Sequence, residues 1–176
     1  MRSPGGEFVM YPLTRNEHAD GILRRSRAPV DAPALEYKAR GYLHALLDHL
    51  EYVGVLALEL FVSGDRLLAN EFAPRVHNSG HWTIEGAATS QFENHLRAVT
   101  NQPLGPTACR GHAGMLNLIG TIPQAARQLR IPGCWLHDYG KQPREGRKLG
   151  HITVVADSAG ERDERLRQIE VSLTEV

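Results

Sequence analysis

The stretch at residues 53–82, VGVLALELFVSGDRLLANEFAPRVHNSGHW, decides the fold of this chain. Its first part holds two runs rich in apolar and branched side chains, residues 53–62 and 67–72, on either side of a short turn that contains glycine. Two such runs around a turn of this kind predict a β-hairpin. The second part is a polar segment with an arginine, two histidines and an amide close to a carboxylate, which is typical of a functional site.

The expected hairpin brings two carboxylates together. If residues 64–66 form a three-residue loop, Glu59 and Glu71 lie directly opposite each other on one face. Opposed like charges destabilise a sheet unless a cation lies between them, and a glutamate in an apolar, buried strand needs a partner. Together with the amide of Asn70, the two glutamates suit a hard cation such as Mg²⁺. Two alternatives remain open: a two-residue loop takes Glu71 off this face, or Glu59 points outward from an edge strand.

The polar segment at residues 73–82 follows the hairpin directly. Arg75 offers a planar fork suited to carboxylate, bicarbonate or phosphate, and His77 can donate a proton or a hydrogen bond near neutral pH. This pattern favours an anion pocket. A polar loop that satisfies its own turns beneath a Trp82 lid is the alternative. A zinc site built from His77 and His81 would need a helix and a third ligand, and neither is evident.

A basic cluster at residues 141–148, KQPREGRK, holds four cations between two expected strands. A run of charges is often no more than a solvated surface. Pro and Gly shape a turn here, however, and a close backbone approach flanked by Arg147 and Lys148 would also bind a phosphate monoester. His151 begins the following strand and is either structural or a lining residue.

Periodicity predicts the other elements and an α+β fold. Ser90 and Glu93 form a capping box at the start of one helix, whose apolar face is expected to consist of Phe92, Leu96 and Val99. We expect strands at residues 7–13, 115–119, 135–139 and 150–155, helices at 34–50, from 90 onward and at 161–173, an irregular segment at 14–33, and a boundary between two units at 101–111.

Composition limits the classes of function. The chain has 176 residues, 41% of them apolar, and a formal net charge of zero, so neither a nucleic acid nor a membrane surface is expected as a partner. No apolar run approaches the roughly 18 residues of a membrane helix, and we expect a cytoplasmic protein. Cys109 and Cys134 fit no metal-ligand spacing and are expected to be inert thiols.

Three stretches together resemble a known family: EYVGVLALELFV at residues 51–62, NEFAPRVHNSGHWTIEGAATSQFENHLRA at 70–98 and GKQPREGRKLGH at 140–151. The chain is similar to the 5-(carboxyamino)imidazole ribonucleotide synthases. These are ATP-grasp ligases of purine biosynthesis, also called the ATPase subunit of phosphoribosylaminoimidazole carboxylase. The resemblance begins near YPLT at residues 11–14 and covers nearly the whole chain, and the APRxHNSGHW string is its most specific part.

The resemblance implies an enzyme that uses ATP and Mg²⁺ to carboxylate 5-aminoimidazole ribonucleotide with bicarbonate, through carboxyphosphate. Glu59 and Glu71 would hold the metal against the ATP phosphates, with Asn70 beside them, and His18 would line the nucleotide site.

The remaining site residues follow from the same resemblance. Arg75 and His77 would position bicarbonate and stabilise the carboxyphosphate. The ribonucleotide site is expected to include four further residues: Asn78, Lys141, Arg147 and Lys148.

The resemblance also implies a division of the chain. Residues 1–104 are expected to be the C-terminal part of an ATP-grasp domain, a mostly antiparallel sheet with helices that carries the metal, ATP and bicarbonate side. Residues 105–176 are expected to be a small β-rich domain with the ribonucleotide-phosphate site.

Complete members of the family begin with a nucleotide-fold domain and carry phosphate-binding lysines and a glycine-rich loop that this sequence lacks. We therefore expect a fragment, a truncated product or one piece of a split enzyme that is inactive alone. A separate N-terminal half and a homodimer remain open as protein partners. A ribotide-phosphate-binding protein without catalysis and a dimerisation remnant are the alternative functions.

Overall fold

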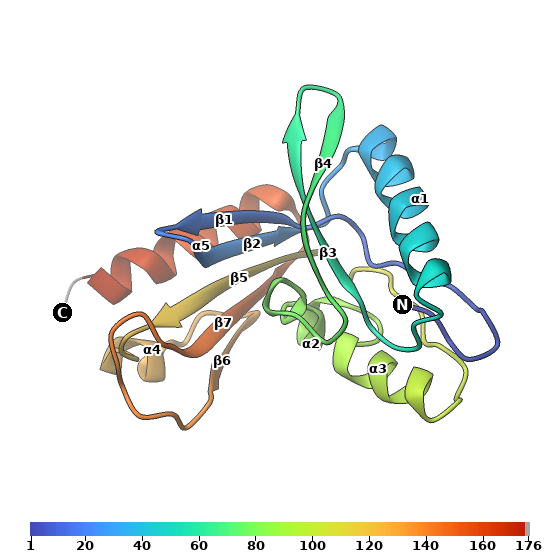
Figure 1. The fold of residues 1–176 in the computed structure, drawn as a ribbon. Helices are drawn as coiled ribbons and strands as arrows, with labels where there is room; N and C mark the ends of the chain where they lie inside the picture. Colours follow the sequence, from blue (N-terminus) through green and yellow to red (C-terminus); the bar gives the residue numbers. More distant parts are fainter. Residues whose placement is uncertain (175–176) are drawn as a thin grey trace.

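The structure, a computed structural model, describes residues 1–174 and shows an α+β fold with two antiparallel sheets (Figure 1). The larger sheet has the strand order β1-β2-β5-β7-β6. Its strands are β1 (Arg15–Ala19), β2 (Ile22–Ala28), β5 (His112–Ile119), β6 (Cys134–Asp138) and β7 (Lys148–Ala156). The expected α+β class and mostly antiparallel pairing are confirmed.

Helices cover both faces of this sheet. On one face α5 (Ala159–Thr174) and the short α4 (Gln124–Gln128) enclose an apolar core. Its fully or nearly fully buried members are Leu116, Leu118, Ala126, Ile152, Val154, Leu166 and Ile169. On the other face α2 (Thr83–Gly86) packs against β5 and β7, and Trp82 is buried beside Met115. The stacked His137 and His151 of β6 and β7 lie on this second face, where His137 meets Glu85 of α2.

The smaller sheet is the predicted hairpin of β3 (Ala57–Ser63) and β4 (Arg66–Ala73), which projects from the molecule beside α1 (Pro33–His49) (Figure 1). The predicted three-residue loop is wrong, because Ser63 pairs with Arg66 and the turn has two residues. Gly64 has a φ of 61°, which a glycine adopts without steric cost.

A β-bulge restores the predicted pairing of the two glutamates. The register shifts between Glu59 and Leu60, whose partners are Glu71 and Ala69, so Asn70 is the extra residue on β4. Glu59 and Glu71 therefore lie opposite each other although the loop is shorter than expected. The hairpin is also less buried than expected: Phe61 and Val62 are each 60% exposed, because no other element covers the end of β3 within residues 1–174.

The two longer helices before β5 begin close to where the sequence predicts. α1 spans Pro33–His49, and in α3 (Gln91–Val99) the hydroxyl of the N-cap residue Ser90 accepts from the Glu93 amide at 3.1 Å. The predicted buried face of α3 is wrong for two of its members, because Leu96 is 63% and Val99 is 50% exposed. The helix instead buries polar and small residues, namely Gln91, Asn94 and Ala98.

The N-terminal region also differs from expectation. The predicted strand at residues 7–13 is reduced to an isolated bridge between Arg2 and Phe8. Residues 14–33 are not irregular, because they contain the β1–β2 hairpin. β2 pairs with β5, so hydrogen bonds of one sheet cross the expected boundary between residues 104 and 105. The division of the chain into two domains stays a proposal. None of the helices in the described part of the chain is long and apolar enough to cross a membrane.

Candidate functional site

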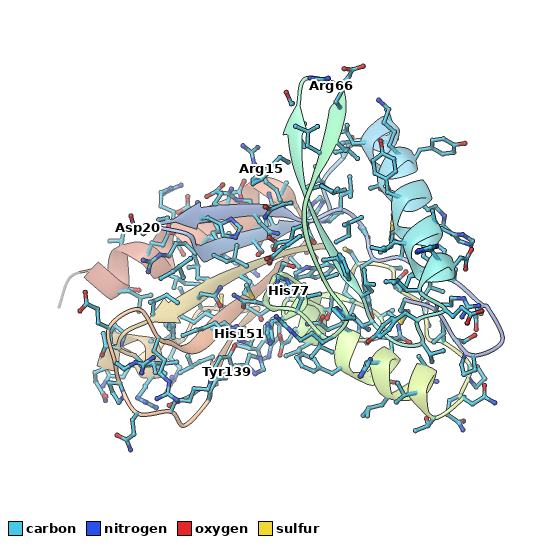
Figure 2. All side chains as sticks on the ribbon, viewed as in Figure 1. Arg15, Asp20, Arg66, His77, Tyr139 and His151 are labelled. Atoms are coloured by element: carbon cyan, nitrogen blue, oxygen red, sulfur yellow. The ribbon has the colours of Figure 1, made fainter. Side chains whose placement is uncertain are left out.

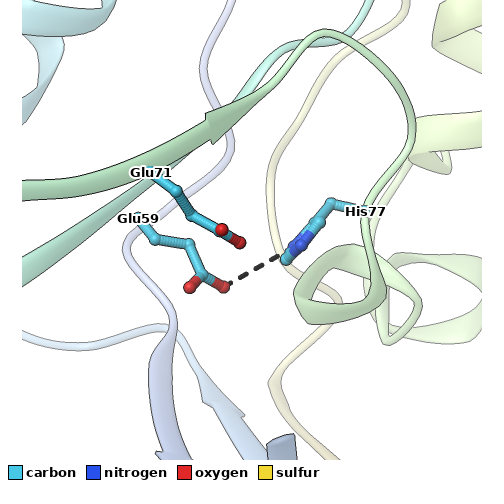
Figure 3. Close-up of side chains that lie close together, drawn as sticks. All are labelled: Glu59, Glu71 and His77. Atoms are coloured by element: carbon cyan, nitrogen blue, oxygen red, sulfur yellow. Dashed lines mark ion pairs between the residues drawn. The ribbon is translucent and has the colours of Figure 1, made fainter. Parts of the chain in front are cut away.

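The opposed glutamates and a histidine from the following loop form one cluster (Figure 3). Ligand atoms of Glu59, Glu71 and His77 all lie within 4.8 Å of one another. The side chains of His77 and Glu59 are only 11% and 15% exposed, and 3.7 Å separates His77 Nδ1 from Glu59 Oε1. The Asn70 bulge and the turn into the loop thus bring two carboxylates and an imidazole to the same point. Such a set can hold a divalent cation.

The His77 ring is neutral at physiological pH and has a defined orientation. Burial lowers the pKa of His77, more than the carboxylate of Glu59 raises it, and Arg75 lowers it further. The Ser79 amide donates to His77 Nδ1 at 3.4 Å, and the Ser79 hydroxyl lies 2.9 Å from the same atom. With Nδ1 as acceptor, the proton of the neutral ring is on Nε2. That N–H group is available to an anion.

Gln91 fixes the backbone on which this ring is mounted. Its Oε1 accepts from the His77 amide at 2.9 Å, and its Nε2 donates to the His77 carbonyl at 2.7 Å. Gln91 is 3% exposed, and its own amide donates to Thr83 Oγ1. A Cβ atom at Gly80 would come within 2.7 Å of Gln91 Oε1, so only glycine lets this loop pack so closely. The loop is therefore a clamped structure.

Cations from two distant segments lie beside the carboxylate cluster. Burial, followed by the positive charges of Lys141 and Arg75, lowers the pKa of Lys148 to about 8. Arg75 and Lys148 also lower the pKa of His77. Arg75 is exposed, and its Nη1 donates to the Val76 carbonyl at 3.1 Å. The loop after the hairpin and the start of β7 thus place positive charge beside the carboxylates, which favours binding of an anion there.

Aromatic and imidazole rings lie next to this cluster; Figure 2 labels His77, His151 and Tyr139 in this part of the molecule. The Lys141 and Lys148 ammonium groups lie 5.1 Å and 5.6 Å from the centre of the Tyr139 ring. The Tyr139 hydroxyl lies 2.6 Å from His151 Nδ1, and the His151 ring lies 5.2 Å from that of His81. Electrostatic interactions of Lys148 with His77 and His81, and the ring contacts of His81 with His151 and Tyr139, therefore link the hairpin cluster to the β6–β7 region.

Comparison with known proteins agrees with this geometry. Residues 1–92 match the family model of the ATP-grasp domain, and residues 113–165 match that of the phosphoribosylaminoimidazole carboxylase C-terminal domain. The chain belongs to the ATP-grasp family.

Individual relatives of this ATP-grasp chain are N5-carboxyaminoimidazole ribonucleotide synthases. The Vibrio cholerae protein is 51% identical over 97% of this chain and 45% of its own length. The crystal structure of the Thermus thermophilus protein has a TM-score of 0.94 and 53% identity, covering 99% of this chain and 49% of that one. The Aspergillus clavatus structure in complex with ADP and 5-aminoimidazole ribonucleotide has a TM-score of 0.86 and 34% identity, covering 94% and 47%. The ATP-grasp chain thus spans about half the length of these relatives.

Not every residue expected at the site of the ATP-grasp chain is brought to it. The Arg147 side chain donates to the Gln142 carbonyl at 3.3 Å within the basic turn. His18 is exposed on β1, and no contact among the described residues joins it to the carboxylates. Asn70 is exposed at the bulge. Asn78 is part of the clamped loop, and its buried Oδ1 has no hydrogen-bond partner among residues 1–174.

The loop expected at residues 73–82 is confirmed, with a 3-10 turn η1 (Asn78–Gly80) in place of an α-helix. His81 Nδ1 lies 3.0 Å from the Asn78 carbonyl, and burial lowers the pKa of His81 to about 4. Among the described residues the metal-type cluster of His77 includes the two glutamates and not His81, so the structure does not support the zinc pair.

Sequence reasoning did not find four polar residues beside the site of this ATP-grasp chain: Glu85, Gln91, His137 and Tyr139. Glu85 and His137 meet at 2.8 Å although 52 residues separate them in sequence. Gln91 follows the cap residue Ser90, a position where polar residues are ordinary. No local pattern distinguishes these four residues, since only the tertiary fold brings them together.

Proposed function

We propose that this chain carries the C-terminal part of the active site of an ATP-dependent carbon–nitrogen ligase that carboxylates 5-aminoimidazole ribonucleotide with bicarbonate. One observation supports this most directly: the opposed Glu59 and Glu71 form one cluster with His77, on which the positive charges of Arg75 and Lys148 act. The similarity to enzymes named N5-carboxyaminoimidazole ribonucleotide synthase supports the substrate class.

The donor set fits Mg²⁺. Glu59 and Glu71 supply hard oxygen ligands from opposed strand positions, and their mutual repulsion is relieved when a cation lies between them. Bound there, Mg²⁺ would neutralise charge on the ATP phosphates. The Asn70 bulge holds the two carboxylates in register, so the hairpin presents both to the nucleotide.

Bicarbonate is the proposed ligand of Arg75 and His77. The overall chemistry transfers the γ-phosphoryl group of ATP to bicarbonate, giving carboxyphosphate and ADP; the amine of the ribonucleotide then takes the carboxyl group and phosphate leaves. Arg75 offers two parallel N–H groups to the oxygens of bicarbonate. The Nε2–H group of neutral His77 adds a donor without a second positive charge.

Lys141 and Lys148 are the proposed ligands of the ribonucleotide phosphate. Both ammonium groups lie against the Tyr139 ring, and the repulsion between them is relieved when a phosphate dianion binds between them. Arg147 and Asn78 stay predicted members of this substrate site, and His18 stays a predicted member of the nucleotide site.

We further propose that turnover requires the part of the relatives that this chain does not span. Apolar side chains of the hairpin and α1 are available for such a partner, including Tyr37, which is 82% exposed, and Phe61, which is 60% exposed. An open apolar groove of about 370 Å³ lies between the two elements. It is lined by Tyr42, Leu46, Leu58, Leu60, Leu67 and Ala69. A homodimer and a cytoplasmic location stay predictions.

The test is reconstitution. This chain is mixed with a separately expressed N-terminal part of the Vibrio cholerae relative, and phosphate release that depends on both bicarbonate and 5-aminoimidazole ribonucleotide is followed. We expect activity in the mixture, none with either part alone, and loss of activity with Glu71→Gln. Equal activity of Glu71→Gln and unaltered chain would contradict the proposed role. A mixture without activity, although the two parts co-sediment, would favour a ribotide-binding protein without catalysis.

A further inference from the structure

Two of the three lysines of this chain lie against one aromatic ring. Lys141 lies in the loop between β6 and β7 and Lys148 is the first residue of β7; their Nζ atoms lie 5.1 Å and 5.6 Å from the Tyr139 ring centre. The third, Lys38, lies on α1 and donates to the Asp65 carbonyl. The face of an aromatic ring attracts an ammonium group, more strongly as the pair is removed from water. The position of the Tyr139 ring therefore governs where both ammonium groups are held.

The Tyr139 ring is itself anchored by its hydroxyl. The hydroxyl oxygen lies 2.6 Å from His151 Nδ1, and His151 is 1% exposed. Burial raises the pKa of Tyr139 to about 12, and burial together with the neighbouring His137 lowers the pKa of His151 to about 3. Both groups are neutral across the physiological range, so the hydrogen bond between them does not change with pH there.

His151 is held from its other side. Its ring stacks on that of His137 with centroids 4.4 Å apart and an angle of 13° between the planes. His137 Nε2 lies 2.8 Å from Glu85 Oε1, so a carboxylate on α2 fixes the stack. β6 and β7 pair His137 directly with His151, which makes the stack a consequence of sheet register. The anchor of Tyr139 is thus part of the sheet, whereas Lys141 lies in the loop between β6 and β7 and Lys148 lies at the first position of β7.

We propose that Tyr139 and His151 are positioning residues that hold Lys141 and Lys148 ready for the phosphate of the substrate. The identity of the ligand in this inference rests on the proposed function, whereas the anchoring of the Tyr139 ring by His151 does not depend on it. A lysine side chain that becomes ordered on binding loses rotamer entropy, which weakens binding. A ring fixed to the sheet orders both side chains before the phosphate arrives and so lowers that cost.

The experiment uses the small number of lysines. In the chain with ¹³C-labelled lysine, three ε-methylene signals are expected, and Lys→Arg variants assign them. Protons held over a ring face are shifted upfield by the ring current, so the signals of Lys141 and Lys148 are expected upfield of the Lys38 signal. Tyr139→Phe keeps the ring and removes only the hydroxyl. We expect this variant to lose the upfield shifts, since the ring is no longer fixed.

Substitutions at His151 provide the matched control. His151→Leu removes the partner of the hydroxyl and is expected to reproduce the effect of Tyr139→Phe. His151→Asn places an amide near the position of Nδ1, where it can accept or donate, and is expected to retain the upfield shifts. A purely structural role for the hydrogen bond would leave the ε-methylene signals of folded Tyr139→Phe unchanged. Unchanged signals, or signals in the unaltered chain no further upfield than that of Lys38, would overturn the inference.

Binding of ribose 5-phosphate separates this inference from the proposed function. We expect Tyr139→Phe to bind this probe about tenfold more weakly than the unaltered chain, because one or two lysines must then be ordered on binding. If the unaltered chain does not bind the probe while the upfield shifts depend on the hydroxyl, the proposed ligand is wrong and the positioning role stands. Equal binding by Tyr139→Phe and the unaltered chain would overturn the positioning role.

Discussion

The clamp formed by Gln91 is the feature of the site whose energetic contribution the structure defines most clearly. Gln91→Leu preserves the approximate size of the side chain and removes both hydrogen bonds to the His77 backbone, at 2.9 Å and 2.7 Å. A buried backbone group left unpaired costs about 1 to 3 kcal/mol. Because the His77 backbone is only partly buried, we expect a total loss of about 2 to 3 kcal/mol in the free energy of unfolding.

Urea unfolding followed by circular dichroism measures this loss. With a denaturant slope of about 2 kcal/mol per molar, the midpoint should fall by about 1 to 1.5 M. Gln102→Leu is the matched control, since Gln102 is exposed just beyond α3, and its effect should stay within about 0.5 kcal/mol. If Gln91→Leu lowered the midpoint no more than Gln102→Leu, the loop would not depend on the clamp and the reasoning about His77 would be refuted.

Two further predictions concern stability. His81 and His151 have pKa values of about 4 and about 3 in the folded chain, mainly through burial, against an ordinary 6.5. The unfolded state therefore binds more protons than the folded state as the pH falls below 6.5. The free energy of unfolding should fall by on the order of 2 kcal/mol for each ring between about pH 6.5 and pH 5. Urea midpoints that stay constant over this range would argue against neutral buried rings. Asn94 is fully buried and forms hydrogen bonds with the Tyr11 hydroxyl and the Gly105 backbone. Asn94→Ala should therefore lower the free energy of unfolding by about 2 to 4 kcal/mol in the same assay. A loss below about 1 kcal/mol would show that these hydrogen bonds contribute little.

Most of the fold could be predicted where apolar residues repeat with the period of an element. α1, α5, β5 and β7 follow such patterns, and each lies close to the residues expected. The polar strand β1 carries no such alternation, because it lies at the sheet edge and its side chains pair with those of β2. The buried face of α3 differs from the predicted one because Gln91 and Asn94 are buried through hydrogen bonds, which hydrophobic periodicity does not detect.

The carboxylate pairing was predicted for a reason that was only partly right. The expected loop was one residue too long, and the bulge at Asn70 was not foreseen, but the two differences cancel so that Glu59 faces Glu71. The sequence predicts Lys141 and Lys148 as phosphate ligands and leaves His151 as a structural or lining residue, whereas it does not single out Tyr139. Their arrangement on Tyr139 and His151 follows from the pairing of β6 with β7, which residue spacing alone does not determine.

The most direct test of the central claim is binding of Mn²⁺, a spectroscopic substitute for Mg²⁺, to the chain itself. Electron paramagnetic resonance reports free Mn²⁺ during a titration of the unaltered chain, of Glu59→Gln and Glu71→Gln, and of the exposed control Glu145→Gln. If the opposed glutamates hold the cation, each of the two variants should bind about tenfold or more weakly, since one carboxylate ligand is lost, while Glu145→Gln binds like the unaltered chain. Equal binding by all four proteins would contradict the claim that this hairpin carries the metal site.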